Sequence, residues 1–267
     1  MERKTTDALW RYMDFSKFVD LLLFKKMFFP RLDRFQDEFE GSLPKVYSDF
    51  INAGTVETLK IVAAATGSTI EEIIDAQPDP RELVYVSCWF MSNHESRGMW
   101  DLYTTSADSV AIKSSIPELE QLFAHNPNIC GFPVRYVDYE DPNILKDWLG
   151  EGFMPGFDTP VQLSSIKRIE FKHENEFRIV RYVHQSMKNT PLMKHQKDNI
   201  EFGLNSYLSD LDFIESITFH PESSKWFQET VIELLKKLDF NIQCHQSNLK
   251  SSPNFTNLKS LNKSVSG

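Results

Sequence analysis

From Glu82 onward the sequence is a succession of short segments rich in β-branched and aromatic residues, and this feature constrains the fold most. Such segments, often alternating apolar and polar residues, are typical of strands. They are LVYVSCWF, SVAIKS, VRYVDY, SIKRIEF, EFRIVRYV, NIEFGL, SITFH and NIQCH. Helical patterns interrupt them at 116–125 and 223–238. Because helices and strands do not alternate regularly, we expect an α+β domain with an antiparallel or mixed sheet rather than a doubly wound fold.

The segments before Glu82 have helical patterns. Ser16 is the expected N-cap of an amphipathic helix that ends near Pro30, and 31–41 is expected to be a surface loop. Two further helices are predicted at 55–65 and 69–76, the second with acidic residues in its first turn. We therefore interpret the region of about 42–81 as a helical insertion in a single α+β domain spanning 1–246.

The last segment, 247–267, is rich in Ser, Asn and Lys and has few apolar residues. Such a composition cannot bury enough apolar surface to fold alone, so a flexible, disordered tail is expected. The segment contains three lysines and no carboxylate. It is therefore interpreted either as a frayed terminus or as a segment that binds an acidic partner or nucleic acid.

Charge and hydropathy narrow the function classes. The net charge of −9 argues against a generally basic nucleic-acid-binding protein, because phosphates are bound by Lys and Arg. A local basic groove remains an alternative, formed by Arg31, Arg34, Arg178, Arg181 and the lysines of the tail. No run approaches the ~18–20 apolar residues that span a bilayer, so we expect a cytoplasmic protein without a membrane partner. The three cysteines are expected to be buried free thiols.

Two glutamates in the segment HENEFRIV are the first candidate site residues. Glu174 and Glu176 are separated by one residue, and on a strand such residues project from the same face. Two carboxylates this close are expected to titrate as a coupled pair, with one pKa raised. The alternative is a pair of edge charges that discourage sheet-to-sheet pairing, with Arg178 as a salt-bridge partner.

Arg11 and Ser87 are the next candidates. Arg11 lies between Trp10 and Tyr12, where its guanidinium offers a bidentate fork to a phosphate or stacks on an aromatic ring. Ser87 lies within an apolar strand, and a buried hydroxyl needs a hydrogen-bond partner. In the alternative interpretation that partner is ordinary backbone.

A helical segment and a loop supply further candidates. Met99, Trp100 and Tyr103 have a helical spacing that is typical of core packing, although Tyr103 would present an aromatic face to a bound ring. Asp37 and Glu40 lie in the expected surface loop and are predicted to border the cleft that contains the other candidate residues.

Metal sites are poorly supported by the sequence. No HExxH, Cys/His ligand spacing or GxSxG motif is present. Asp158, Glu170 and Lys172 loosely match an Asp…Glu-x-Lys arrangement that holds Mg²⁺ in nucleases. In the alternative interpretation, Glu170 and Lys172 are an exposed strand face.

Several motifs together resemble a known family. WRY near the N-terminus, FFPRLDRFQDEFEG, VSCWF followed by GMWDLY, VRYVDY and ENEFRIV are similar to the bacterial family catalogued as domain of unknown function 2971. The resemblance covers about residues 9–220. Phe177 stands where the family usually has Trp, and DEFEG where DPFEG is commoner. The family name implies no activity.

A second resemblance implies a mechanism. Arg11 on an early strand, Ser87 on a middle strand and a Glu-x-Glu before a late strand are similar to the Arg-Ser-Glu arrangement of ADP-ribosyltransferases. This implies a split sheet that grips NAD, with Arg11 binding its phosphates or nicotinamide ribose and Ser87 supporting the nicotinamide pocket. It also implies that Glu176 stabilises the oxocarbenium-like centre while Glu174 orients or deprotonates the acceptor.

Tyr12 and Tyr103 complete the expected NAD-binding residues. The function that these resemblances imply is an ADP-ribosyltransferase-like toxin or effector of a bacterial antiphage or toxin–antitoxin system. Its acceptor would be a nucleic acid, with RNA favoured, or a protein, and an antitoxin or immunity protein would be a further partner. Two alternatives remain: a non-catalytic nucleotide-sensing or protein-interaction domain, and a Mg-dependent nuclease.

Overall fold

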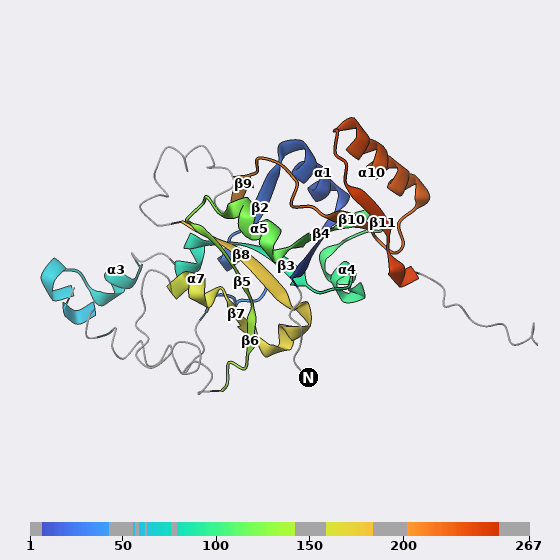
Figure 1. Cartoon of the computed structure of the whole chain (residues 1–267). Helices are drawn as coiled ribbons and strands as arrows, with labels where there is room; N and C mark the ends of the chain where they lie inside the picture. Colours follow the sequence, from blue (N-terminus) through green and yellow to red (C-terminus); the bar gives the residue numbers. More distant parts are fainter. Residues whose placement is uncertain are drawn as a thin grey trace, which may run out of the picture.

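A seven-stranded mixed sheet forms the centre of the molecule (Figure 1). A computed structural model describes residues 7–42, 56, 59–61, 63–75, 79–141, 159–183 and 202–250. The strand order is β11-β10-β4-β1-β3-β8-β5, in which β10 and β11 pair in parallel and the other neighbours are antiparallel. The strands are β1 Ala8–Asp14, β3 Val84–Met91, β4 Ser109–Ser115, β5 Ile129–Pro133, β8 Glu176–Tyr182, β10 Ser216–Phe219 and β11 Gln243–Gln246. The expected α+β class with a mixed sheet is confirmed.

Two small sheets and several helices surround the central sheet. β2 Lys26–Pro30 pairs antiparallel with β9 Gly203–Tyr207, and β6 Arg135–Val137 pairs in parallel with β7 Ile166–Arg168. The α-helices are α1 Phe15–Phe24, α3 Ile70–Asp75, α4 Arg97–Tyr103, α5 Ile116–Phe123, α7 Thr159–Leu163 and α10 Lys225–Lys237. The 3₁₀ helices are η1 Leu32–Arg34, η2 Pro80–Leu83, η3 Ile169–Glu174 and η4 Asn248–Lys250. Among the described helices, none has the length and apolar character needed to cross a membrane.

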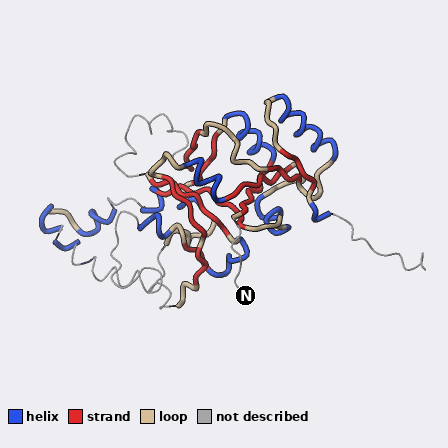
Figure 2. The backbone as a smooth tube through the Cα atoms, in the orientation of Figure 1, coloured by secondary structure: helices blue, strands red, loops and turns tan. Residues whose placement is uncertain are grey.

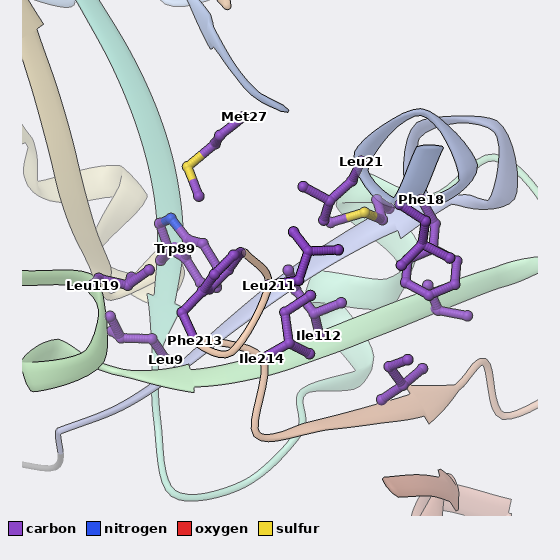
Figure 3. Close-up of a cluster of buried hydrophobic side chains, with 14 of the residues drawn as sticks. Leu9, Phe18, Leu21, Met27, Trp89, Ile112, Leu119, Leu211, Phe213 and Ile214 are labelled. Atoms are coloured by element: carbon purple, nitrogen blue, oxygen red, sulfur yellow. The ribbon is translucent and has the colours of Figure 1, made fainter. Parts of the chain in front are cut away.

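The main hydrophobic core lies between one face of the central sheet and the helices α1, α5 and α10 (Figure 1). Figure 3 shows part of this core, in which Phe18 and Leu21 of α1 approach Ile112 of β4. A smaller cluster lies on the opposite face, where α4 packs Met99 and Trp100 onto β1. Both faces of the sheet are therefore covered near its centre.

The sheet is split between β1 and β3. These strands pair at two positions, Leu9↔Met91 and Trp10↔Phe90, whereas β1 pairs with β4 and β3 with β8 at seven positions each. Beyond Trp10, β1 therefore follows β4 and β3 follows β8. The strand trace in Figure 2 shows these elements at the centre of the molecule. The sheet therefore consists of two halves that are joined at one end.

The expected helix from Ser16 to near Pro30 is wrong in both its bounds. Asp14 is the N-cap, and α1 ends at Phe24, followed by Lys25 in the left-handed conformation with φ 44°. The chain then forms β2, in which Met27 and Phe29 are buried and Phe28 is exposed. This alternation has a strand period of two, and pairing with β9 stabilises it. A short apolar run does not by itself distinguish the two periods.

The expected surface loop at 31–41 is a loop apart from η1, but it lies on the surface only in part, because both of its ends are buried. Leu32 opens η1 with 1% of its surface exposed, and Glu40 is 2% exposed. Leu32 packs against Val84 and Val86 of β3. The segment therefore covers part of the sheet and brings a carboxylate into the interior.

The described part of the expected helical insertion is helical. Residues 56, 59–61 and 63–66 have helical conformation, and α3 follows. The N–H of Thr69 donates to Glu72 Oε2 at 2.8 Å, while the N–H of Glu72 donates to Thr69 Oγ1 at 3.1 Å. This reciprocal capping box confirms the predicted helix start. The rest of the 42–81 prediction lies largely outside the described residues.

Residues 247–250, the described start of the expected C-terminal tail, are part of the folded domain. Ser247 Oγ donates to Glu95 Oε2 at 2.8 Å, and the N–H of Asn248 donates to Glu95 Oε1 at 2.7 Å. Ser247 is buried, so the start of the predicted tail packs against the domain. Residues 251–267 lie outside the described part of the chain. The three cysteines are free, as predicted, but none is fully buried: Cys88 and Cys244 are half-buried, and Cys130 is exposed on β5 at the edge of the sheet.

Candidate functional site

A cavity of about 810 Å³ lies where β1 and β3 separate. Its lining includes Tyr12 and Met99, which belong to the cluster under α4. It also includes Trp89 and Ile112, which belong to the main core on the other face. Residues of both faces line one cavity because the strands between them have parted. The split therefore produces an opening in the sheet that a ligand can enter.

Arg11 lines this cavity as a cation that pairs with no carboxylate among the described residues. Its guanidinium donates to Ser87 Oγ at 2.7 Å and to the carbonyl oxygen of Phe28 at 3.3 Å, and it lies 5.7 Å from the ring centroid of Trp89. Across the described chain, no carboxylate forms an ion pair with it. Burial lowers the pKa of Arg11 to about 10. A half-buried cation without a counter-charge among the described residues is unfavourable, so this position favours an anionic ligand.

Ser87 holds the Arg11 guanidinium in place. The hydroxyl is fully buried, accepts hydrogen bonds from Arg11 and from Trp89 Nε1 at 3.2 Å, and donates to Met27 Sδ at 3.4 Å. Its partners are side chains, so the alternative of an ordinary backbone partner is wrong. These three contacts use the one proton and both lone pairs of the Ser87 hydroxyl. Ser87 positions Arg11 and does not itself line the cavity.

Three carboxylates meet at the ammonium group of Lys167 in another part of the same cavity. Lys167 Nζ lies 2.8 Å from Glu176 Oε1, 2.9 Å from Glu174 Oε2 and 3.1 Å from Glu40 Oε1. All four side chains are at most 8% exposed. Lys167 therefore explains how two glutamates so close in sequence can share one buried site: a cation lies between them.

Arg178 is the second cation of this cluster. Its Nε donates to Glu176 Oε2 at 2.9 Å, and its two terminal nitrogens donate to Glu40 at 2.9 and 3.0 Å. The side chain is completely buried. We call Glu40, Glu174, Glu176, Lys167 and Arg178 the ion cluster. Three carboxylates and two cations leave it with one net negative charge when all groups are ionised.

The backbone around the glutamates differs from the expectation. Glu174 ends η3, and Asn175 has a positive φ of 36°, so the two glutamates are not on one strand. Their carboxylates converge through this turn rather than through the strand period. The edge-charge alternative is wrong because β8 lies between β3 and β5. The predicted contact of Arg178 with Glu176 is confirmed.

The two glutamates have opposite pKa shifts. Burial opposes the charge of Glu176, but Arg178 and Lys167 together outweigh it and lower the pKa of this carboxyl well below its usual value. Burial raises the pKa of Glu174, and the nearby charge of Glu176 adds to this, against the effect of Lys167. The predicted coupled pair with one raised pKa is confirmed. Glu176 therefore stays ionised to lower pH than an ordinary glutamate, whereas Glu174 takes up a proton more readily than an ordinary glutamate does.

The two tyrosines have different surroundings. The hydroxyl of Tyr103 donates to Glu174 Oε2 at 2.9 Å, and burial together with the nearby acids raises the pKa of this tyrosine. Tyr12 lines the cavity with its ring, while its hydroxyl accepts a hydrogen bond from the N–H of Ser96 at 2.9 Å. Tyr12 also packs edge-on against Trp100 at 4.8 Å. Tyr12 therefore positions α4, and Tyr103 contacts the ion cluster directly.

The other acids expected at the cleft do border it. Asp37 lines the cavity together with Glu40, and Arg168 binds Asp37 with two nitrogens at 2.9 and 3.2 Å. Sequence reasoning missed Lys167, which lies between Ile166 and Arg168 in SIKRIEF. The only hint in the sequence is that Lys167 interrupts an apolar strand pattern. Nothing near Lys167 in the sequence indicates that it pairs with Glu40, which is far away along the chain.

The basic groove expected from four arginines is not formed. Arg31 is paired with Asp33 at 2.6 Å, and Arg178 is buried in the ion cluster. Arg181 is partly buried and donates to Ser206 Oγ at 3.0 Å. Arg34 remains at the surface, with 47% of its side chain exposed. Arg34, which pairs with Asp33 at 3.6 Å, is therefore the one of the four arginines that stays exposed, and the tail lysines beyond residue 250 lie outside the described residues.

The described residues of the nuclease pattern do not form a metal site. Glu170 and Lys172 are exposed on η3, which is a 3₁₀ helix rather than the expected strand. Asp158 lies outside the described residues. Within the described ranges no group of three or more His, Cys, Asp or Glu side chains is arranged to hold a metal ion.

Comparisons of this chain with protein-family models, with curated proteins and with solved structures find no match. Its functional interpretation therefore depends on the geometry of the cavity. That geometry places Arg11, Tyr12, Tyr103, Glu174 and Glu176 around one space, with Ser87 directly behind Arg11.

Proposed function

We propose that this protein is an ADP-ribosyltransferase-like enzyme that uses NAD as a co-substrate. The observation that carries the proposal is the distribution of charge in the split-sheet cavity. Among the described residues, no carboxylate pairs with the cation Arg11, whereas the ion cluster in the same cavity has a net negative charge. NAD has the matching distribution, with an anionic diphosphate and a cationic nicotinamide ring. By resemblance, the enzyme is proposed to be a toxin or effector of a bacterial antiphage or toxin–antitoxin system.

The cavity has the size and lining that such a ligand needs. Its volume of about 810 Å³ lies within the ~300–1,000 Å³ range of small-molecule sites. A guanidinium held by Ser87 presents a fixed fork to a phosphate. The rings of Phe90 and Tyr103 also line the cavity and supply apolar faces for nicotinamide or adenine. These features support NAD as the ligand.

The two glutamates divide the proposed chemistry between them. The bond from the nicotinamide nitrogen to the ribose C1′ breaks, and nicotinamide leaves as a neutral molecule with the bonding electrons. The carbon becomes positively charged, and Glu176, whose carboxylate form is favoured by Arg178 and Lys167, stabilises it. An oxygen or nitrogen of the acceptor then forms a bond to C1′, and its proton passes to Glu174. The raised pKa of Glu174 suits that role.

One observation favours a second candidate function. Both carboxylate oxygens of Glu176 already accept hydrogen bonds. Oε1 accepts from Lys167 and Arg178, and Oε2 accepts from Arg178. This is also the geometry of a structural ion network. In this second candidate the protein is a nucleotide-sensing domain, which binds NAD or a related nucleotide in the same cavity without cleaving it.

The test uses NAD labelled in the adenylate portion and a total cell extract. Nicotinamide release and transfer of label to RNA, DNA and protein are measured for the wild type, Glu176→Gln and Glu174→Gln. Glu118→Gln is the matched control, because Glu118 is exposed on α5. We expect release and transfer by the wild type and the control, a large loss in Glu176→Gln, and loss of transfer in Glu174→Gln.

Three other results would decide against the transferase. Binding of NAD without nicotinamide release would select the sensing domain. Failure of the wild type to bind NAD would contradict both candidates. Unchanged activity in Glu176→Gln, with thermal unfolding showing that the variant is folded, would remove Glu176 from the mechanism.

A further inference from the structure

Four exposed aromatic side chains lie along the β2–β9 ribbon. We call Phe24, Phe28, Phe202 and Tyr207 the aromatic rim; their exposed fractions are 57%, 38%, 60% and 73%. Lys26 of β2 is paired with Tyr207 of β9, and Phe24 and Phe202 lie just before the two strands. Several large apolar side chains grouped on a surface mark a binding site.

The geometry of the ribbon holds the ring of Phe28 in place. Phe28 is paired with Asn205, and a Cβ atom added to Gly203 would lie 2.4 Å from the Phe28 ring. The ring therefore lies directly over the glycine. A flat ring held over backbone leaves its other face available for stacking.

Cations accompany the rings. Lys26 Nζ lies 4.7 Å from the ring centroid of Phe24, and Arg34 Cζ lies 5.5 Å from that of Phe202. Lys17 is exposed nearby and lines the cavity. Lys26 also pairs with Asp20 at 3.0 Å, but the Asp20 side chain is 44% exposed, so the pair is accessible to solvent. The rim therefore combines aromatic faces with positive charge in a chain whose net charge is −9.

The aromatic rim is continuous with the cavity. Lys26, Phe28 and Asn205 belong to the ribbon and also line the split-sheet cavity. Figure 1 shows β2 and β9 next to α1, at the side of the central sheet. A chain that lies along the ribbon thus passes the mouth of the proposed NAD site.

We propose that the aromatic rim binds single-stranded nucleic acid and directs one nucleotide of it to the cavity as the acceptor. The acceptor role rests on the proposed function, whereas the binding does not. Exposed rings stack bases without sequence preference, and adjacent Lys and Arg side chains neutralise the backbone phosphates. Rings next to cations match this chemistry better than a protein partner, whose contact surface would be depleted of lysine.

The binding test uses a short fluorescent oligouridine RNA and no NAD. Anisotropy is measured for the wild type, for Phe202→Ala with Tyr207→Ala, and for Trp226→Ala. Trp226 is the matched control, because it is 70% exposed on α10, away from the ribbon. We expect the double variant to bind at least about tenfold more weakly and the control to bind like the wild type. Lys17→Ala with Arg34→Ala should flatten the dependence of affinity on salt.

Two results would overturn the inference. The first is that the wild type binds neither the RNA nor its DNA counterpart. The second is that Trp226→Ala loses as much affinity as the double variant does. If label is instead transferred to a protein in the extract, and the double variant transfers it with the same yield as the wild type, the rim has no role in the choice of acceptor.

Nicotinamide release into water, measured without RNA, separates the two proposals. The double variant should retain it, because its rings lie outside the ion cluster. RNA binding without any nicotinamide release would contradict the proposed function and leave the surface assignment standing.

Discussion

Arg11 of β1 and Ser87 of β3 are 76 residues apart in the sequence, and Arg11 Nη1 lies 2.7 Å from Ser87 Oγ across the split in the sheet. The two strands do not pair at this level, so side chains rather than backbone connect the halves. The bond places a cation at the cavity wall and leaves its remaining donors for a ligand.

Replacing Ser87 with Ala should weaken this connection. Arg11 and Trp89 Nε1 would both lose a buried acceptor, which costs about 1–3 kcal/mol for an unsatisfied group. We expect a lower free energy of unfolding by urea titration and weaker NAD binding by calorimetry. Ser209→Ala, at an exposed position, should change stability by less than about 0.5 kcal/mol. Equal stability of the two variants would contradict the assigned role.

Replacing Arg11 with Met should stabilise the ligand-free protein and remove ligand binding. The change eliminates a half-buried cation that pairs with no carboxylate among the described residues, and we expect a gain of about 1 kcal/mol, or ~2–4 °C in Tm. NAD should no longer raise the Tm of the variant. Arg97→Met, at a side chain that is 54% exposed, is the control. A lower Tm for Arg11→Met without ligand would show that Arg11 is a structural residue.

Lys167 should be much harder to replace. Lys167→Met leaves three carboxylates with Arg178 alone, and breaking a buried ion network by removing one partner costs about 3–5 kcal/mol. Part of this loss should be recovered as the pH is lowered, because burial and the charge of Glu176 raise the pKa of Glu174 and a proton on this carboxyl relieves the repulsion. Urea unfolding near pH 7 and near pH 5 measures both effects. Lys236→Met, which breaks an exposed pair with Glu233, should change little.

The lowered pKa of Glu176 predicts the pH dependence of stability. Below the usual value of 4.5 the unfolded state binds a proton at this carboxyl that the folded state does not, so stability rises with pH in that range. The contribution of Glu176 is therefore present above about pH 4.5 and lost as the pH falls. Thermal unfolding between about pH 6 and pH 3 should show a steeper loss for the wild type than for Glu176→Gln. Parallel curves would show that Glu176 is not held as an anion.

Much of the fold is determined by local patterns. The strands that contain Ser87, Val110 and Ile217 were predicted from short β-branched and aromatic segments, and α10 from its helical spacing. The capping box at Thr69 was readable because its two partners are three residues apart. These features depend on residues within a few positions of one another.

Other features depended on contacts between distant segments. Met27 and Phe28 satisfied a helical spacing, but β2 forms because it pairs with β9 near the far end of the domain. Glu40 was assigned to a surface loop, yet it pairs with Arg178, which is 138 residues away.

The sequence by itself identified which residues are chemically able to form a site, namely Arg11, Ser87 and the two glutamates. The tertiary structure decided what each of them does there. It separated β1 from β3 to open the cavity, left Arg11 without a described anionic partner, and inserted Lys167 between the carboxylates. The reason is physical: side-chain identity and local period are encoded along the chain, whereas the energy of a buried charge depends on which distant groups surround it.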